Sequence, residues 1–144
     1  MDLQNPEKKM SKSEENPNGY ILILDPPEVI RKKISRAVTD SVGEVKFCDE
    51  QPGVKNLMTI LSTIEGISME EIEERYKGQG YAQFKLDVAE AVVKELEPVQ
   101  KRVKELLDNK GKLEEIFKAG AEKANYVATK TLRKMQKKIG LVQY

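Results

Sequence analysis

Apolar residues recur at helical spacing through most of the chain beyond residue 25. The pattern is clearest in residues 54–65, where the i, i+3, i+4 and i+7 positions of an amphipathic helix are Leu57, Ile60, Leu61 and Ile64. Together with helix start and stop residues, the periodicity predicts five helices, over residues 25–38, 54–65, 68–78, 81–109 and 113–138. We therefore expect an all-α bundle of about five helices without internal repeats.

The predicted helix ends carry residues that are typical of helix caps and breaks. Asp25 precedes two prolines, which indicates an N-cap with prolines in the first turn. Ser68 and Glu71 form the sequence pattern of a capping box. Pro98 lies inside the fourth helix and is expected to kink it. The turn at residues 109–111 should separate the fourth helix from the fifth.

Each predicted helix has an apolar face, expected in the core, and a charged face, expected in solvent. The solvent face of the first helix should carry four basic residues: Arg31, Lys32, Lys33 and Arg36. The last helix should contribute eight residues to the core: Ile116, Phe117, Ala121, Ala124, Val127, Ala128, Leu132 and Met135.

The segments outside the predicted helices differ in polarity. Residues 1–19 are polar and are expected to form a flexible loop that buries little apolar surface. Residues 20–24 form a short apolar run, either a strand-like connector or a buried turn, which periodicity cannot separate. Residues 39–53 should form a second loop. We accordingly divide the chain into a loop, residues 1–19, and a helical domain, residues 20–144.

Composition favours one small helical domain from a reducing compartment. The chain has 144 residues, 34% of them charged and 6% aromatic, with no Trp. The net charge is only +1, so any binding of nucleic acid must come from local basic patches. The single cysteine, Cys48, excludes an intramolecular disulfide and fits a reducing cytosol. No apolar run approaches 18 residues, so we predict a cytoplasmic protein without a membrane span.

The loop contains the run Lys9-Met10-Ser11-Lys12-Ser13, with turn residues on both sides. Two ammonium groups and two hydroxyls on a mobile loop suit the binding of a polyphosphate, because lysine supplies charge and serine supplies directed donors. A basic, solvated tail is the alternative interpretation.

This run resembles the second signature of class I aminoacyl-tRNA synthetases, and the loop of residues 1–19 that contains it is here called the KMSKS loop. The flanks of the run resemble the bacterial tryptophanyl-tRNA synthetase family, and the resemblance extends from Met1 to about Leu141. It is carried by residues 1–8, 16–21, 30–41, 52–57, 76–81 and 120–124. The tyrosyl enzymes share the loop, but residues 37–41 and 52–57 are not expected in them.

The resemblance implies that Lys9 and Lys12 are catalytic and hold the phosphates of ATP while pyrophosphate leaves. Met10, Ser11 and Ser13 would complete the nucleotide-binding loop. The implied substrates are tryptophan, its tRNA and ATP, with Mg²⁺.

The chain contains no histidine, so the His-containing first signature of the family is missing. We therefore expect the C-terminal portion of such an enzyme, inactive without the Rossmann-like N-terminal half. The complete enzyme would be a homodimer, whereas this portion would be a monomer.

Within residues 117–139, the basic face of the last predicted helix is opposed only by Glu122: Lys118, Lys123, Lys130, Arg133, Lys134, Lys137 and Lys138. The helix dipole favours the last three of these cations, whereas a polyanion better explains the others. By resemblance, we assign the tRNA contacts to Lys123, Lys130, Arg133 and Lys134. The bases of the anticodon would need exposed polar or aromatic side chains nearby, and the sequence does not identify them.

Two other interpretations of the chain remain open. It could be a non-enzymatic helical RNA-binding module or a fragment without activity. A metal site is not expected, because the four glutamates of residues 70–74 lack histidine or aspartate partners and suit a solvated helix face.

Overall fold

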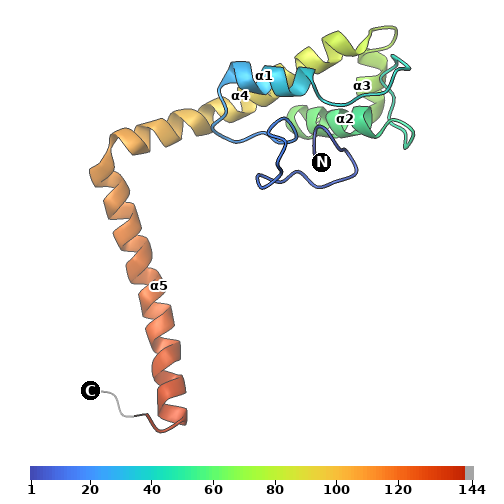
Figure 1. Ribbon diagram of the computed structural model, residues 1–144. Helices are drawn as coiled ribbons and strands as arrows, with labels where there is room; N and C mark the ends of the chain where they lie inside the picture. Colours follow the sequence, from blue (N-terminus) through green and yellow to red (C-terminus); the bar gives the residue numbers. More distant parts are fainter. Residues whose placement is uncertain (142–144) are drawn as a thin grey trace. The chain divides into compact units, whose positions relative to one another are not determined.

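The computed structural model describes residues 1–141, and within this range it contains helices and no strand (Figure 1). The five helices are α1 (Pro27–Ser35), α2 (Pro52–Glu65), α3 (Met69–Arg75), α4 (Tyr81–Asp108) and α5 (Lys110–Lys138). The expected all-α fold with about five helices is therefore confirmed. None of the helices in the described range is long and apolar enough to cross a membrane.

The chain forms two compact units, Met1–Gln100 and Lys101–Tyr144, with the boundary inside α4. The first unit holds the hydrophobic core, which α1, α2, α3 and the first half of α4 build together with Leu3 and Val45. Tyr76 and Phe84 pack edge to face in this core, with ring centroids 5.1 Å apart. The division of the chain at residue 19 into a KMSKS loop and a helical domain is based on the expected functions of the two parts, and it stays a prediction.

Local capping explains several of the helix ends. Ser68 and Glu71 form the expected capping box of α3, in which each side chain accepts a hydrogen bond from the other residue's backbone N–H. Gly66 ends α2 in the left-handed conformation with φ of 69°, which glycine adopts without strain. Asn109 caps α5 through a hydrogen bond from the N–H of Lys112 (3.1 Å).

The N-cap assigned to Asp25 is wrong. Pro26 occupies the N-cap position of α1 and makes no side-chain cap. The Asp25 carboxylate instead accepts hydrogen bonds from the N–H of Leu22 (2.9 Å) and from Lys33 Nζ (2.7 Å). The apolar run at residues 20–24 therefore forms a turn held by Asp25, and three of its side chains are exposed: Leu22, Ile23 and Leu24.

The core positions predicted for the last helix are also wrong. No residue of α5 is buried, and the side chains of Phe117 and Leu132 are 66% and 53% exposed. The second unit is a helical segment that buries none of its described residues. Helical periodicity located α5 correctly, but an apolar face alone does not supply the elements that would cover it.

Candidate functional site

The KMSKS loop is anchored at its base by backbone hydrogen bonds. The N–H of Leu3 donates to the carbonyl of Gly19 (2.8 Å), and the N–H of Asp2 donates to that of Lys8 (2.9 Å). The Leu3 side chain is only 1% exposed and belongs to the core. The expectation that residues 1–19 pack little against the helices is therefore wrong for Leu3.

The Asp2 carboxylate organises the turn at the start of this loop. It is buried and accepts hydrogen bonds from the N–H groups of Gln4 (2.7 Å) and Asn5 (2.9 Å). It also lies against Gly19, where a Cβ atom would overlap Asp2 Oδ2 and lie 2.7 Å from Oδ1. The absence of a side chain at Gly19 thus lets the two ends of the loop meet.

Helix α2 supports the same base. Asn56 is buried, and its Nδ2 donates to the carbonyls of Met1 (3.2 Å) and Asp2 (3.4 Å). The N–H of Val38 donates to the carbonyl of Leu3 (2.8 Å), and a Cβ atom at Gly53 would overlap the carbonyl oxygen of Val38. The stretch 52–57 therefore contributes directly to the site that holds the loop.

The charged residues of the loop are exposed above this base. Lys9, Ser11, Lys12 and Ser13 are exposed, whereas Met10 is half-buried and packs against the core. The Ser11 hydroxyl oxygen accepts a hydrogen bond from the N–H of Ser13 (3.2 Å). Neither lysine forms an ion pair with any residue of the range 1–141. Two cations without an ion-pair partner on an anchored loop suit an anionic ligand.

The four cations predicted for the first helix do not share one solvated face, contrary to expectation, and the last of them, Arg36, follows the end of α1. Lys33 is buried and forms an ion pair with Asp25 (2.7 Å), and its ammonium lies 5.0 Å from the centre of the Tyr20 ring. Arg31 donates two hydrogen bonds to Glu90 (2.6 and 3.0 Å). Of the four, Lys32 and Arg36 are exposed and have no carboxylate partner among the described residues.

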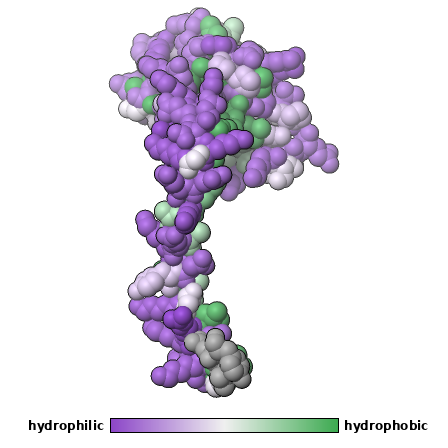
Figure 2. Space-filling model, turned by 90° about the vertical axis from the view of Figure 1, so that its left-hand side faces the viewer, coloured by the Kyte–Doolittle hydropathy of each residue, from purple (hydrophilic) through white to green (hydrophobic). Residues whose placement is uncertain are grey.

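The basic face of α5 is fully exposed, as are the four residues to which we assigned tRNA contacts. Hydrophilic residues dominate the visible face of the molecule (Figure 2). One shallow groove on α5 contains three of those four residues and is lined by Glu122, Asn125, Tyr126, Thr129, Lys130, Arg133 and Lys134. Sequence reasoning missed Tyr126, although its position among the cations was readable from helical spacing.

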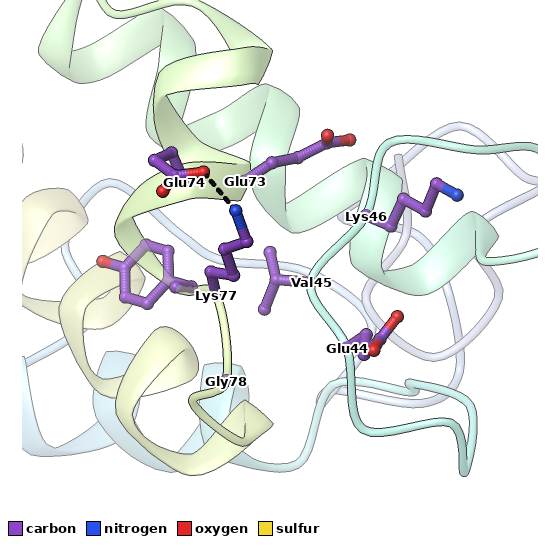
Figure 3. Close-up of a pocket in the computed structure, with 8 residues that line it drawn as sticks. Glu44, Val45, Lys46, Glu73, Glu74, Lys77 and Gly78 are labelled. Carbon is purple, nitrogen blue, oxygen red and sulfur yellow. Dashed lines mark hydrogen bonds and ion pairs between the residues drawn. The ribbon is translucent and has the colours of Figure 1, made fainter.

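A second hollow of about 310 Å³ lies between the loop before α2 and the end of α3 (Figure 3). Its charges are largely satisfied internally. Lys77 pairs with Glu74 (2.9 Å), and Glu73 accepts a hydrogen bond from the N–H of Phe47 (2.7 Å). These contacts hold the loop to α3.

Tyr81 anchors the same loop from α4. Its hydroxyl donates to Asp40 Oδ1 (2.6 Å) and accepts from the N–H of Gly43 (3.1 Å). Burial and the hydrogen bond with Asp40 raise the pKa of Tyr81 to about 12. Within residues 1–141, no group of three or more His, Cys, Asp or Glu side chains is placed to hold a metal ion.

Comparisons with known proteins agree with this architecture. A family model described as tRNA synthetases class I (W and Y) matches residues 1–97. The tryptophan–tRNA ligase of Clostridium perfringens (strain 13 / Type A) is 68% identical over 142 residues, which cover 99% of this chain and 43% of that protein. The tryptophan–tRNA ligase of Clostridium tetani (strain Massachusetts / E88) is 63% identical over a match that covers 99% of this chain and 42% of that protein.

Solved structures show the same similarity. The tryptophanyl-tRNA synthetase of Mycoplasma pneumoniae superposes with a TM-score of 0.82 at 33% identity, covering 99% of this chain and 43% of that one. The tryptophanyl-tRNA synthetase of Campylobacter jejuni, complexed with ADP and tryptophan, superposes with a TM-score of 0.74 at 30% identity. This match covers 98% of this chain and 44% of that one. The chain thus spans less than half the length of these relatives. It belongs to the class I tRNA synthetases of the tryptophan and tyrosine type.

Proposed function

We propose that this chain supplies the KMSKS loop and a tRNA-binding helical segment to a tryptophan–tRNA ligase. The observation that carries this proposal is the pair of exposed, unpaired lysines, Lys9 and Lys12, on a loop whose base is fixed by Asp2 and Gly19. The identity of 68% to a tryptophan–tRNA ligase across 99% of the chain supports the choice of tryptophan.

The reaction of such a ligase begins with attack of the tryptophan carboxylate on the α-phosphorus of ATP. A bond forms between a carboxylate oxygen of tryptophan and the α-phosphorus. The bond between the α-phosphorus and the oxygen that bridges to the β-phosphate breaks, and pyrophosphate leaves with its electron pair. Negative charge grows on the leaving group, and the ammonium groups of Lys9 and Lys12 would stabilise it without transferring a proton. The substrate would be ATP with Mg²⁺ bound to its phosphates. A hydroxyl of the tRNA would then attack the carbonyl carbon of the adenylate, so that the tryptophanyl group passes to the tRNA and AMP leaves.

The chain alone should show no tryptophan-dependent exchange of pyrophosphate into ATP, since the family's first signature and tryptophan pocket belong to the N-terminal half. We propose that this half is its obligatory partner, that the complete enzyme is a cytoplasmic homodimer, and that the isolated portion is a monomer.

The catalytic role is testable in a chimera that joins this chain to the preceding part of the Clostridium perfringens relative. Lys12→Ala should lower kcat for exchange by about 100-fold or more with little change in the KM for tryptophan, because the interaction strengthens in the transition state. Lys8→Ala is the matched control and should have a small effect. Equal activity of the Lys12→Ala and unaltered chimeras would refute the assignment.

The tRNA-binding role rests on the exposed cations Lys123, Lys130, Arg133 and Lys134. The chain should bind tRNA weakly, with an affinity that falls steeply as salt rises. Reversing the charges of Lys130 and Arg133 should remove most of the binding. The matched control is reversal at Lys32 and Arg36, which are exposed and unpaired, whereas Lys33 is unsuitable because it is buried.

A non-enzymatic RNA-binding module is the second candidate, favoured by α5, of which no residue is buried. The chimera separates the two functions. A module would bind RNA but contribute nothing to exchange when joined to the N-terminal half, and a fragment without activity would do neither.

A further inference from the structure

Tyr126 occupies an unusual position for an aromatic residue, because it lies in the middle of the basic face of α5. Its side chain is 72% exposed, more than that of any other exposed large hydrophobic residue in the described range. Lys123 and Lys130 lie one turn before and one turn after it, and Arg133 follows two turns after it. Four exposed side chains of one helix face therefore combine one aromatic ring with three cations.

Packing within the chain does not account for this ring. At 100° per residue, Phe117 lies roughly opposite Tyr126, and the apolar residues Ala124 and Leu132 lie nearer to Phe117. The hydroxyls of Tyr76 and Tyr81 bond to Asp87 (2.8 Å) and Asp40 (2.6 Å). The Tyr126 hydroxyl, by contrast, makes no hydrogen bond among the described residues. This tyrosine thus has neither the burial nor the polar contact that the core tyrosines have.

The surroundings of the ring suit an unpaired nucleotide. Tyr126 shares a shallow groove with Asn125 and Thr129, whose side chains offer hydrogen-bond donors and acceptors beside the ring. Glu122 is the single acid at the start of this groove. Lys123 and Lys130 are seven residues apart, or about 10 Å along the helix axis, so they can reach phosphates on both sides of a base that lies between them.

We propose that Tyr126 is a stacking platform for an unpaired base of RNA, whose flanking phosphates bind Lys123, Lys130 and Arg133. Stacking on an exposed aromatic ring requires a base that is free of a duplex, such as one in a single-stranded loop. The inference rests on the proposed RNA-binding role of α5 and adds to it a contact with the base itself.

The absence of tryptophan from the chain gives a direct probe. Tyr126→Trp creates a single-tryptophan protein with its fluorophore at the proposed site. Titration with an eight-nucleotide oligoadenylate RNA should quench its fluorescence. The matched control is Phe117→Trp, because Phe117 is 66% exposed on the opposite face and should not be quenched. Equal quenching of the two variants would overturn the proposal.

Affinity measurements separate stacking from charge. Tyr126→Ala should weaken binding of the oligoadenylate about tenfold, in line with the usual contribution of one stacked base. It should leave the binding of inorganic polyphosphate, which has charge but no bases, unchanged. Tyr126→Phe should retain RNA affinity, since the ring remains. Lys130→Gln should weaken binding of both ligands and reduce the salt dependence of RNA binding.

The outcomes also distinguish this inference from the proposed function. If Tyr126→Ala binds RNA as tightly as the unaltered chain while reversal at Lys130 and Arg133 abolishes binding, the stacking platform is refuted and the basic interface stands. If the unaltered chain itself does not bind RNA, both are refuted, while the role of Lys12 in the chimera remains separately measurable. Unchanged far-ultraviolet circular dichroism of each variant checks that the helix is intact.

Discussion

At the residue scale, the contact between Asp2 and Gly19 decides how the KMSKS loop closes. Gly19→Ala would place a Cβ atom in the volume of the Asp2 carboxylate, which the N–H groups of Gln4 and Asn5 hold in place. We expect a loss of about 1–3 kcal/mol in the free energy of unfolding, the usual cost of overpacking. Urea denaturation measures this change.

The double variant identifies the cause of that loss. In an Asp2→Ala background the carboxylate is gone, so adding Gly19→Ala should cost much less than it does alone. Additive effects of the two substitutions would show that the obstruction lies elsewhere.

Lys33 and Lys32 are adjacent in sequence but differ in environment. Lys33→Met leaves the Asp25 carboxylate in a site where both side chains of the pair are only 9% and 11% exposed. An uncompensated buried charge costs about 3–5 kcal/mol, so the variant should be strongly destabilised. Lys32→Met is the matched control and should change stability by less than about 0.5 kcal/mol, because Lys32 is exposed. Similar thermal unfolding of the two variants would contradict the buried pair.

At the element scale, α2 and α5 have similar apolar periodicity but opposite burial. Leu57 of α2 is fully buried, whereas Leu132 of α5 is 53% exposed. Leu57→Ala should therefore cost about 2–5 kcal/mol, and Leu132→Ala less than about 1 kcal/mol. Denaturation of the chain followed by circular dichroism compares the two. A large loss at Leu132 would show that α5 is packed when the chain is in solution.

At the scale of the whole molecule, two tyrosines make the first unit sensitive to alkali. Burial and the hydrogen bond with Asp87 raise the pKa of Tyr76 to about 12, and Tyr81 has a similar value. An unfolded tyrosine ionises near pH 10, so the unfolded state releases these protons first. The stabilisation of the folded state by these two tyrosines is complete below about pH 10 and should be lost as the pH rises toward 12.

Urea midpoints at pH 9 and pH 11 measure this loss. The double variant Tyr76→Phe and Tyr81→Phe cannot ionise, so its midpoint should fall less between these pH values than that of the unaltered chain. Lysines also titrate in this pH range, but they do so in both proteins. The difference between the two falls in urea midpoint therefore comes from the tyrosines. An identical fall in both would mean that other groups cause the alkaline sensitivity.

The sequence by itself determined the local structure and the family of this chain. Helical periodicity and the Ser68 and Glu71 capping box depend on contacts between residues three or four positions apart, which can be read directly from the order of residues. The same holds for the run from Lys9 to Ser13, whose resemblance to the synthetases agrees with the family model that matches residues 1–97. No knowledge of distant contacts was needed for these conclusions.

Only the tertiary structure decided which residues are buried and which contacts hold the loop. The sequence predicts that Leu3 and Lys33 are exposed to solvent, yet contacts with distant segments bury both. The meeting of Asp2 with Gly19 joins residues that periodicity does not relate. The apolar pattern of α5 predicts core residues, but none of the residues of this helix is buried. Burial depends on what packs against a face, and a local pattern carries no information about that partner.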